Sequence, residues 1–231
     1  MGLHIGCILD GNRRYADKLG LPRLIGHTRG AENLINLMKG IKKLINENSR
    51  YNITEASLYV LSMQNLLRSE EELTWLADLF CNSFKKILDH KEFLEGGIQV
   101  NFFGRTHLLR QDVQDMIEKV REKTKDNSKF KLNFCIAYGG QEEIVDAVNK
   151  VIKSGKSEVS KEEFEDYLYS KNYPDIIIRT GDSIRTSNFL MWQSAYSEWF
   201  FLKKSWPEFN IDDLRDIMDE FFDVRKRRFG K

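Results

Sequence analysis

The 231-residue sequence has only three prolines and contains no low-complexity stretch that resembles a linker. A chain of this length can bury a sizeable core in one large domain or in two small ones. Since no linker separates two halves, we expect a single domain over residues 1–231. The net charge of +1 argues against a dedicated nucleic-acid binder.

Cysteines and long apolar runs are also scarce. Cys7, Cys81 and Cys135 lie in apolar segments without CxxC or metal-type spacing, which predicts buried thiols in a reducing compartment. The sequence contains no run of about 18 apolar residues, so we expect no membrane span. The first apolar run is too short for a signal peptide and leads directly into Asp and Arg. We therefore expect a cytoplasmic protein.

The remaining sequence alternates between strand-like and helical patterns. Strands are predicted at Leu3–Leu9, Ala56–Leu61, Ile98–Phe103, Leu132–Ala137, Asp175–Arg179 and Trp199–Phe201. Helices are predicted at Arg29–Asn48, Glu70–Phe93, His107–Thr124, Gln141–Lys153, Ser160–Ser170 and Ile211–Arg228. This alternation predicts an α/β fold in which helices cover both faces of a mainly parallel central sheet.

The first strand ends in Asp10-Gly11-Asn12-Arg13-Arg14. Backbone N–H groups at a strand-to-helix junction favour an anion, and arginine guanidiniums match phosphate oxygens. Asp10 would repel a phosphate unless a divalent cation lay between them, and Mg²⁺ is usually held by one or two carboxylates plus phosphate oxygens. The segment therefore suggests a Mg²⁺–diphosphate, although a helix cap with solvated arginines explains it about equally well.

Two further basic clusters are expected near the same sheet edge, where parallel α/β sheets bind their ligands. One contains Arg23, His27 and Arg29, and the other is the segment RTGDSIRTSN from Arg179 to Asn188. Taken alone, each cluster is explained more simply as a surface loop than as a phosphate-binding site. Neither a Walker A lysine pattern nor GxGxxG is present, so a nucleotide is not indicated.

Large apolar side chains recur at helical spacing in two segments. Phe80, Phe84, Leu88 and Phe93 share one predicted helix, and another carries Leu37, Ile41 and Leu44. Core packing is the ordinary explanation, but a tunnel for a hydrocarbon chain would use the same residue types. Composition does not separate these two interpretations.

Taken together, the motifs resemble the cis-prenyltransferases, the undecaprenyl diphosphate synthase family. The resemblance runs from residue 4 to residue 230. It is carried by HIGCILDGNRRYA, GHTRGAENL, LYVLSMQNLLRSEEEL, LNFCIAYGGQEEIVDAV, DIIIRTGDSIRTSNFLMWQSAYSEWFFLKKSWPEF and RRFG.

The resemblance implies a homodimer built on a parallel sheet, with a hydrophobic tunnel between two helices. It implies Mg²⁺-dependent condensation of isopentenyl diphosphate with an allylic prenyl diphosphate, forming a new cis double bond. It also implies a lipid product, so we expect a cytoplasmic protein that makes peripheral contact with a membrane surface.

Residue roles follow from the same resemblance. Asp10 matches the essential aspartate at the Mg²⁺–diphosphate, and Tyr15 an aromatic beside the prenyl chain. The expected contacts of the allylic diphosphate are Gly11, Asn12, Arg13, Arg14, Arg23 and His27. A mobile loop by the reacting carbons is expected at Ser62, Met63, Gln64, Asn65 and Leu66, followed by Arg68. Asn65 matches the position usually assigned to proton removal. Because an amide is a poor base, we expect Asn65 to orient the substrate while a diphosphate oxygen takes the proton.

The isopentenyl diphosphate site is expected at Arg179, Arg185, Thr186 and Ser187. Glu198 matches a metal-linked carboxylate near that site. Arg228 and Gly230 match a C-terminal Arg-x-Gly that reaches the active site across the dimer.

The sequence departs from the family pattern at several positions. The usual loop Ser-Thr-Glu-Asn-Trp has Gln64 in place of Glu and Leu66 in place of Trp, which puts loop closure and primer preference in doubt. In the family, Gly-Glu usually follows the motif Arg-Thr-Ser/Gly. Here Asp182-Ser183 follows Arg179-Thr180-Gly181 instead. Val60 and Leu61 stand where Ala-Phe is common beside the tunnel, and bulk there would shorten the product.

Two other functions fit the same fold. One is a short-chain or irregular prenyl coupling enzyme, and the other is a non-catalytic scaffold subunit that activates a partner. Asp10 and the arginines argue against the scaffold, since such subunits tend to lose them. The basic run Arg225–Arg228 suggests nucleic-acid binding, but cations at a solvated helix end explain it as well.

Overall fold

A computed structural model describes residues 2–47, 49–89 and 96–225. Its centre is a six-stranded, all-parallel sheet in the order β3-β4-β2-β1-β5-β6. The strands are β1 (Leu3–Ile8), β2 (Ile53–Ser62), β3 (Ile98–Phe103), β4 (Phe130–Tyr138), β5 (Ile176–Arg179) and β6 (Glu198–Phe201). The predicted α/β fold with a parallel sheet is confirmed, and every residue of the central strand β1 is buried.

In the described part of the chain, one or two α-helices follow every strand except β5. They are α1 (Asn12–Lys18), α2 (Arg23–Glu47), α3 (Glu70–Asp89), α5 (Gln111–Thr124), α6 (Gly140–Lys153), α7 (Lys161–Glu165) and α8 (Ile211–Glu220). Short 3-10 turns lie at Ser49–Tyr51 (η1), Met63–Leu67 (η2), Thr106–Leu108 (η3) and Trp206–Glu208 (η4), and a π turn at Phe221–Arg225 (η5) closes the described chain.

Several helix boundaries differ from the sequence prediction. α2 begins six residues early, at Arg23 directly after Pro22, and it includes Gly26. A Cβ on Gly26 would lie 2.0 Å from the carbonyl oxygen of Asn12, so this glycine serves the close packing of α1 on α2 rather than a loop. α7 ends at Glu165 rather than Ser170. The predicted ends at Phe93 and Arg228 lie outside the described residues.

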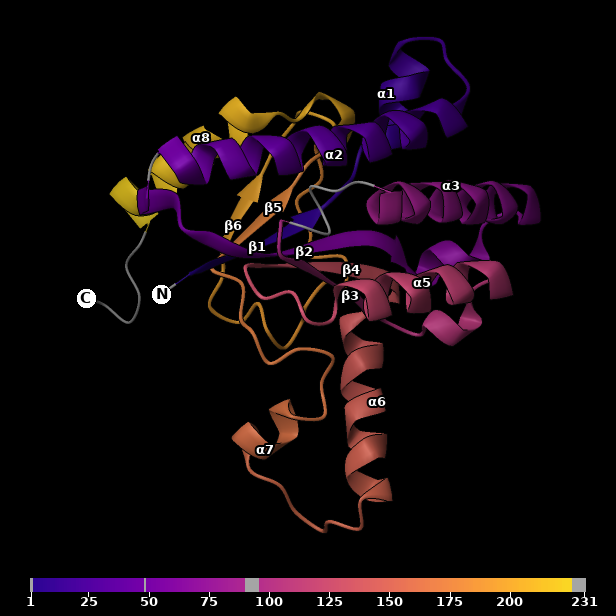
Figure 1. The fold of residues 1–231 in the computed structure, drawn as a ribbon, viewed down its shortest axis with the longest axis vertical. Helices are drawn as coiled ribbons and strands as arrows, with labels where there is room; N and C mark the ends of the chain where they lie inside the picture. The colour runs from indigo at the N-terminus through magenta and orange to yellow at the C-terminus, as the bar shows by residue number, and fades with distance from the viewer. Residues whose placement is uncertain (1, 48, 90–95, 226–231) are drawn as a thin grey trace.

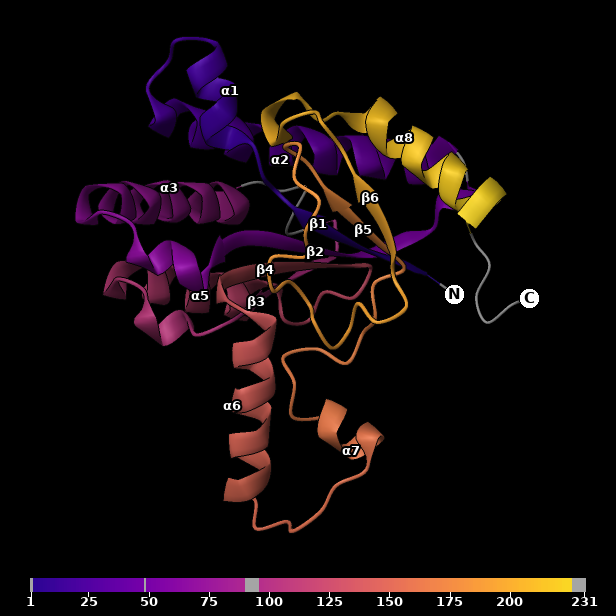
Figure 2. The same ribbon diagram turned by 180° about the vertical axis from the view of Figure 1, so that it is seen from behind.

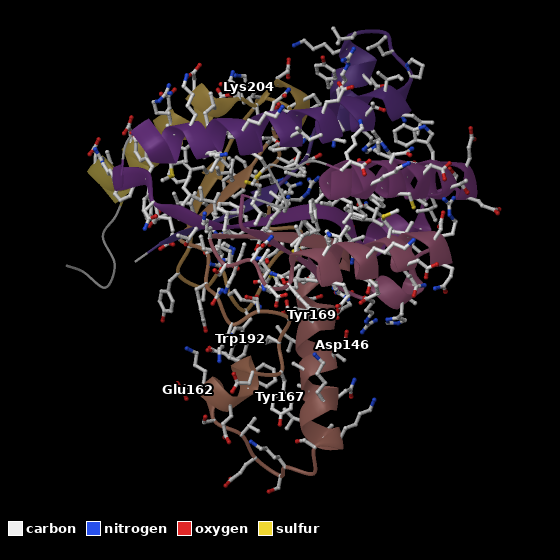
Figure 3. All side chains as sticks on the ribbon, in the orientation of Figure 1. Asp146, Glu162, Tyr167, Tyr169, Trp192 and Lys204 are labelled. Atoms are coloured by element: carbon white, nitrogen blue, oxygen red, sulfur yellow. The ribbon has the colours of Figure 1, made fainter. Side chains whose placement is uncertain are left out.

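The two faces of the sheet are covered differently. The larger apolar core packs α2, α3, α5 and α8 against one face. On the other face a smaller cluster includes Ile8, Tyr59, Tyr138 and Phe189. Beyond it, α6 projects away from the sheet with α7 beside it (Figures 1 and 2). Side chains from the base of α6 still reach the body, since the Tyr169 hydroxyl donates to Asp146 at 3.1 Å (Figure 3).

A buried row of polar side chains crosses four neighbouring strands. The Asn101 amide donates to Asn133, and the Asn133 amide donates to Glu55 at 2.7 Å and to Ser57 at 2.9 Å. The Ser57 hydroxyl lies 2.8 Å from His4 Nε2. Since a shift of one residue would send these groups to the opposite face, the row helps to fix the register of β3, β4, β2 and β1.

Replacing Glu55 tests the importance of this row for stability. Glu55→Ala removes the acceptor of Asn133 and of the Asn172 amide, which donates at 2.6 Å. We expect the free energy of unfolding to fall by about 2–4 kcal/mol because buried donors are left unsatisfied. Urea denaturation measures this, with the exposed β4 residue Lys131→Ala as a control expected to change stability by less than about 0.5 kcal/mol. Equal stability of both variants would contradict the prediction.

Candidate active site

A polar pocket of about 670 Å³ lies at the carboxyl ends of β1, β2 and β5. Parallel sheets bind ligands at this edge because loops from several strands meet there. Its walls come from the segments that follow these three strands, together with His27 of α2 and Leu76 of α3. The edge predicted from the sequence therefore does contain a pocket.

Asp10 lies between two arginines in this pocket. Its Oδ2 accepts from Arg179 Nη2 at 2.9 Å, and its Oδ1 lies 3.2 Å from Arg14 Nη2 and accepts from the Gly11 N–H at 2.7 Å. The carboxylate therefore joins the loop after β1 to the end of β5.

Arg179 is the most deeply placed of the pocket arginines, with 3% of its side chain exposed. Its Nη1 donates to the Arg185 carbonyl and to the Ser187 hydroxyl, both at 2.5 Å. The segment from Arg185 to Ser187 is thus wrapped around the guanidinium, and Ser187 and Asn188 have positive φ angles of 50° and 63°. These contacts fix the β5 loop at the pocket wall.

Glycine is required where the two loops touch. Gly11 and Gly181 have φ angles of 102° and 85°. A Cβ on Gly181 would lie 2.7 Å from Arg14 Nη2 and 2.8 Å from the Asp10 carbonyl carbon. Any other residue at position 181 would push Arg14 or the β1 loop out of place.

A second carboxylate, Glu72 on the first turn of α3, holds two more pocket arginines. Arg13 Nη2 lies 2.5 and 2.6 Å from its two oxygens, and Arg68 Nη1 lies 2.8 Å from Oε1. Burial alone would raise the pKa of Glu72, but the two guanidiniums outweigh it and lower the pKa. The sequence analysis did not identify Glu72, which resembles any acid at a helix N-terminus.

The loop between β2 and α3 is organised by a capping box. The Asn65 N–H donates to the Ser62 hydroxyl at 3.1 Å, and the Ser62 N–H donates to Asn65 Oδ1 at 3.2 Å. Both residues line the pocket. Asn65 is therefore placed by its own loop, with one side-chain atom committed to the cap.

An apolar cavity of about 100 Å³ adjoins the polar pocket. It lies between α2 and α3 over the sheet, and Leu34, Phe80, Phe84 and Phe134 are among its walls. The two spaces share five wall residues, namely Leu9, Asn12, His27, Val60 and Leu76. Some residues fitted both core and tunnel. Of these, Phe80 and Phe84 line the cavity and also belong to the core, Leu37, Ile41 and Leu44 belong to the core, Leu88 packs against it, and Phe93 lies outside the described residues.

His27 and Asn12 lie at the junction between the two spaces. His27 Nε2 and Asn12 Oδ1 are buried polar atoms without a hydrogen-bond partner. Burial, together with the positive charge of Arg68, lowers the pKa of His27 to about 4, so the imidazole is neutral at pH 7. Such atoms are rare in folded proteins, and here they are available to a polar ligand group.

Most of the predicted site residues line the polar pocket. They are Asp10, Gly11, Asn12, Arg13, Arg14, His27, Ser62, Gln64, Asn65, Arg68, Arg179, Arg185 and Ser187. The roles assigned to them stay predictions.

The pocket walls do not include Tyr15, Arg23, Met63, Leu66, Thr186 or Glu198. Arg23 pairs with Asp17 at 3.0 Å, and Leu66 packs against the core. Glu198 begins β6, where its N–H donates to the Asp175 carbonyl at the end of the sheet away from the pocket. Arg228 and Gly230 lie outside the described residues.

Other pocket residues were not predicted from the sequence, namely Ile8, Leu9, Tyr59 and Leu76. Asn188, the last residue of the predicted basic segment RTGDSIRTSN, also lines the walls. Tyr59 donates through its hydroxyl to the Tyr138 carbonyl at 3.1 Å and stacks on Phe189 at 4.9 Å between ring centroids. In an apolar strand or helix, such residues cannot be distinguished from core residues by sequence. Only the fold identifies them as pocket residues.

The donor set fits Mg²⁺ only together with a diphosphate. Among the residues that the structure describes, no group of three or more His, Cys, Asp or Glu side chains could hold a metal ion. Asp10 does present a carboxylate with 30% of its side chain exposed in a pocket of arginines. One carboxylate plus phosphate oxygens is a usual Mg²⁺ environment, so Asp10 is suited to that role.

Comparison with known proteins shows the family of the chain. Residues 8–230 match the family model described as putative undecaprenyl diphosphate synthase. The chain is 39% identical over 230 residues to the isoprenyl transferase of Rickettsia prowazekii, covering 99% of this chain and 97% of that protein. It is 40% identical over 239 residues to the geranylgeranyl-diphosphate-specific tritrans,polycis-undecaprenyl-diphosphate synthase of Methanocaldococcus jannaschii, covering 99% of this chain and 82% of that protein.

Solved structures show the same fold. The lavandulyl diphosphate synthase of Lavandula x intermedia, in complex with dimethylallyl diphosphate, superposes with a TM-score of 0.85 at 27% identity, covering 99% of this chain and 98% of that one. A probable undecaprenyl diphosphate synthase from Campylobacter jejuni gives 0.81 at 27% identity, covering 100% and 99%.

The chain belongs to the undecaprenyl diphosphate synthase family, as its motifs indicated. It is an isoprenyl transferase of the cis type, an enzyme that makes polyprenyl diphosphates.

The position of His27 predicts how stability depends on pH. An unfolded histidine has a pKa near 6.5 and takes up a proton below it, whereas folded His27 stays neutral down to about pH 4. Folding stability should therefore fall as the pH drops below 6.5, by about 2 kcal/mol between pH 7.5 and pH 5 from this residue.

Urea denaturation of the ligand-free protein at both pH values measures this effect. His27→Gln should lose that part of the pH dependence, while an exposed histidine variant, His107→Gln, should keep it. Identical slopes for wild type and His27→Gln would contradict the prediction.

Proposed function

We propose that this enzyme condenses isopentenyl diphosphate with an allylic prenyl diphosphate to give a longer prenyl diphosphate with a cis double bond. The observation that carries the proposal is the joining of an arginine-lined pocket to an apolar cavity at Leu9, Asn12, His27, Val60 and Leu76. A substrate with a charged head and a hydrocarbon tail fits across such a junction. The apolar wall takes the tail and the arginines take the diphosphate.

The geometry also favours one arrangement of the two substrates. Asn12 and His27 line both spaces. Arg13 and Arg14, which follow Asn12 in the sequence, line the polar pocket. The allylic diphosphate, whose tail needs the cavity, is best placed here. Arg179, Arg185 and Ser187 line only the polar pocket and suit isopentenyl diphosphate, which has five carbons. Asp10 connects the two groups of residues, because its carboxylate contacts Arg14 in the first group and Arg179 in the second.

The residues support a reaction in which diphosphate leaves C1 of the allylic substrate. Negative charge builds on the leaving oxygens, and Arg13 and Arg14 are placed to stabilise it. The carbon becomes cation-like and is attacked by the double bond of isopentenyl diphosphate. The apolar cavity excludes water, which would otherwise capture the cation.

A proton must then be lost from the isopentenyl unit. Asn65 lines the pocket, and its side-chain oxygen accepts a hydrogen bond from the Ser62 N–H in the loop cap. A neutral amide is a weak base, so we assign Asn65 to orienting the substrate and the proton to a diphosphate oxygen. Mg²⁺ bound by Asp10 and diphosphate oxygens would supply Lewis-acid stabilisation of the leaving group.

A second candidate function is the coupling of short prenyl units. The fold superposes well on lavandulyl diphosphate synthase, and Val60, where alanine is common in the family, lines both spaces. We favour chain elongation because the curated relatives that match over nearly the whole chain are isoprenyl and undecaprenyl transferases. A non-catalytic scaffold is disfavoured because Asp10, Arg14, Arg179 and Arg185 are all in the pocket.

We also propose a homodimer. Val145, Val148 and Ile152 are exposed on α6, at 53%, 43% and 66%, and their spacing places them along one side of that helix. α6 projects from the body (Figure 1), which makes this apolar stripe accessible to a second copy. An exposed apolar stripe of this kind commonly marks a protein interface.

The single domain over residues 1–231 and the cytoplasmic location stay proposals. One sheet that combines strands from both ends of the chain supports the first. In the described part of the chain, no helix has the length and apolar character needed to cross a membrane. Peripheral contact with a membrane is proposed because the product is a lipid, and no nucleic-acid partner is proposed.

Labelled isopentenyl diphosphate tests the proposed function directly. Purified protein with Mg²⁺ and allylic primers of increasing length should give a homologous series of products, resolved by chromatography. Excess EDTA should reduce turnover at least 100-fold, since it would remove the cation that Asp10 would help to hold and that would stabilise the leaving diphosphate. A single short product would favour the coupling enzyme, and unchanged turnover in EDTA would remove the metal from the mechanism.

Light scattering during size-exclusion chromatography tests the dimer. Val148→Lys places a charge in the α6 stripe and should shift the protein from dimer to monomer mass. Leu19→Lys, at a residue that is 52% exposed next to α1, is the matched control and should leave the mass unchanged. A dimer that survives Val148→Lys would contradict the assignment of this surface.

A further inference from the structure

Glu72 is the meeting point of four separate segments around the pocket. Its carboxylate contacts Arg13 from α1 at 2.5 and 2.6 Å and Arg68 from the end of the β2–α3 loop at 2.8 Å. His27 Nε2 from α2 lies 3.9 Å away, and Glu72 itself belongs to α3. The side chain is 18% exposed, so these interactions are only partly screened by water.

The arrangement parallels that of Asp10 but differs in one respect. Each carboxylate holds two guanidiniums, Arg14 and Arg179 for Asp10, and Arg13 and Arg68 for Glu72. Asp10, Arg13 and Arg68 line the pocket, whereas Glu72 is not among the lining residues. Glu72 therefore contacts both arginines from outside the pocket lining, while the arginines themselves line the pocket.

We propose that Glu72 is a positioning residue for prenyl transfer, which sets Arg13 and Arg68 against the allylic diphosphate and ties the loop that carries Asn65 to the end of β1. The proposal rests on the function proposed above. Two guanidiniums side by side repel each other, and a carboxylate between them keeps both in place before the substrate arrives. Arginines held in this way stabilise the leaving diphosphate without reorganising during the reaction.

The first turn of α3 distinguishes this role from ordinary helix stabilisation. Glu70, Glu71 and Glu72 are consecutive acids at the helix N-terminus, where any acid is favourable. Glu70 and Glu71 are exposed and can serve the helix, whereas Glu72 is turned to the arginines. Glu71→Gln is therefore a matched control for Glu72→Gln, with the same chemical change one residue away.

The central experiment compares steady-state kinetics of the two variants and the wild type. For Glu72→Gln we expect kcat to fall at least 10-fold, with the KM of each substrate within about threefold of wild type. Loss of positioning weakens substrate binding while loss of a negative charge strengthens it, so the two effects offset each other in KM. Misplaced arginines stabilise the leaving diphosphate less well in the transition state, so kcat falls. Glu71→Gln should retain kcat within about twofold, and Glu72→Asp, which keeps the charge, should recover part of the lost activity.

Two measurements separate positioning from simple loss of structure. Calorimetric titration with inorganic pyrophosphate should give the same stoichiometry for Glu72→Gln and wild type, which shows that every molecule still has a formed pocket. In an Arg13→Ala/Arg68→Ala background, Glu72→Gln should lower kcat by less than threefold further, because a residue that acts through these arginines has nothing left to position.

The outcomes are distinct for the two proposals. Wild-type kcat in Glu72→Gln, or an equal loss in Glu71→Gln, overturns the role of Glu72 while prenyl transfer stands. A full additional loss in the double-arginine background also overturns it. No turnover by the wild type with isopentenyl diphosphate and any primer overturns the proposed function, and the role of Glu72 falls with it.

Discussion

The ion pairs between carboxylates and arginines at the carboxyl ends of β1, β2 and β5 are the interactions on which the rest of this site depends. An anion-binding pocket needs several guanidiniums close together, and guanidiniums repel one another. Asp10 and Glu72 resolve this conflict by taking two arginines each. The pocket is thereby assembled before a substrate enters, although it keeps an excess of positive charge.

The parallel sheet determines where these pairs can form. Because the strands run in one direction, Asp10 after β1 and Arg179 at the end of β5 reach the same edge from positions 169 residues apart in the sequence. The same edge borders the cavity between α2 and α3, so charge and hydrocarbon binding are adjacent. His27 lies where the polar pocket meets the apolar cavity, and burial together with Arg68 and Arg13 keeps its imidazole neutral.

The alternation of apolar runs and helical patterns was enough to predict the parallel α/β sheet, and the polar strand ends predicted the edge that contains the pocket. Residues with unusual chemistry for their position, such as Asp10 and Arg179, were found in this way. Gly26 was left outside the predicted helix, which started at Arg29, because only the packing of α1 on α2 shows that a Cβ would meet the Asn12 carbonyl. Glu72 and Tyr59 were missed because their importance lies in contacts between distant segments, which spacing along the chain does not encode.

The placement of the two diphosphates can be measured in a crystal structure with isopentenyl diphosphate and a non-cleavable thiodiphosphate analogue of an allylic primer. We expect one diphosphate on Arg13, Arg14 and His27 with its hydrocarbon tail in the cavity beside Phe80. We expect the other diphosphate on Arg179, Arg185 and Ser187. A tail that lies outside the cavity, or two diphosphates bound away from these arginines, would contradict this placement.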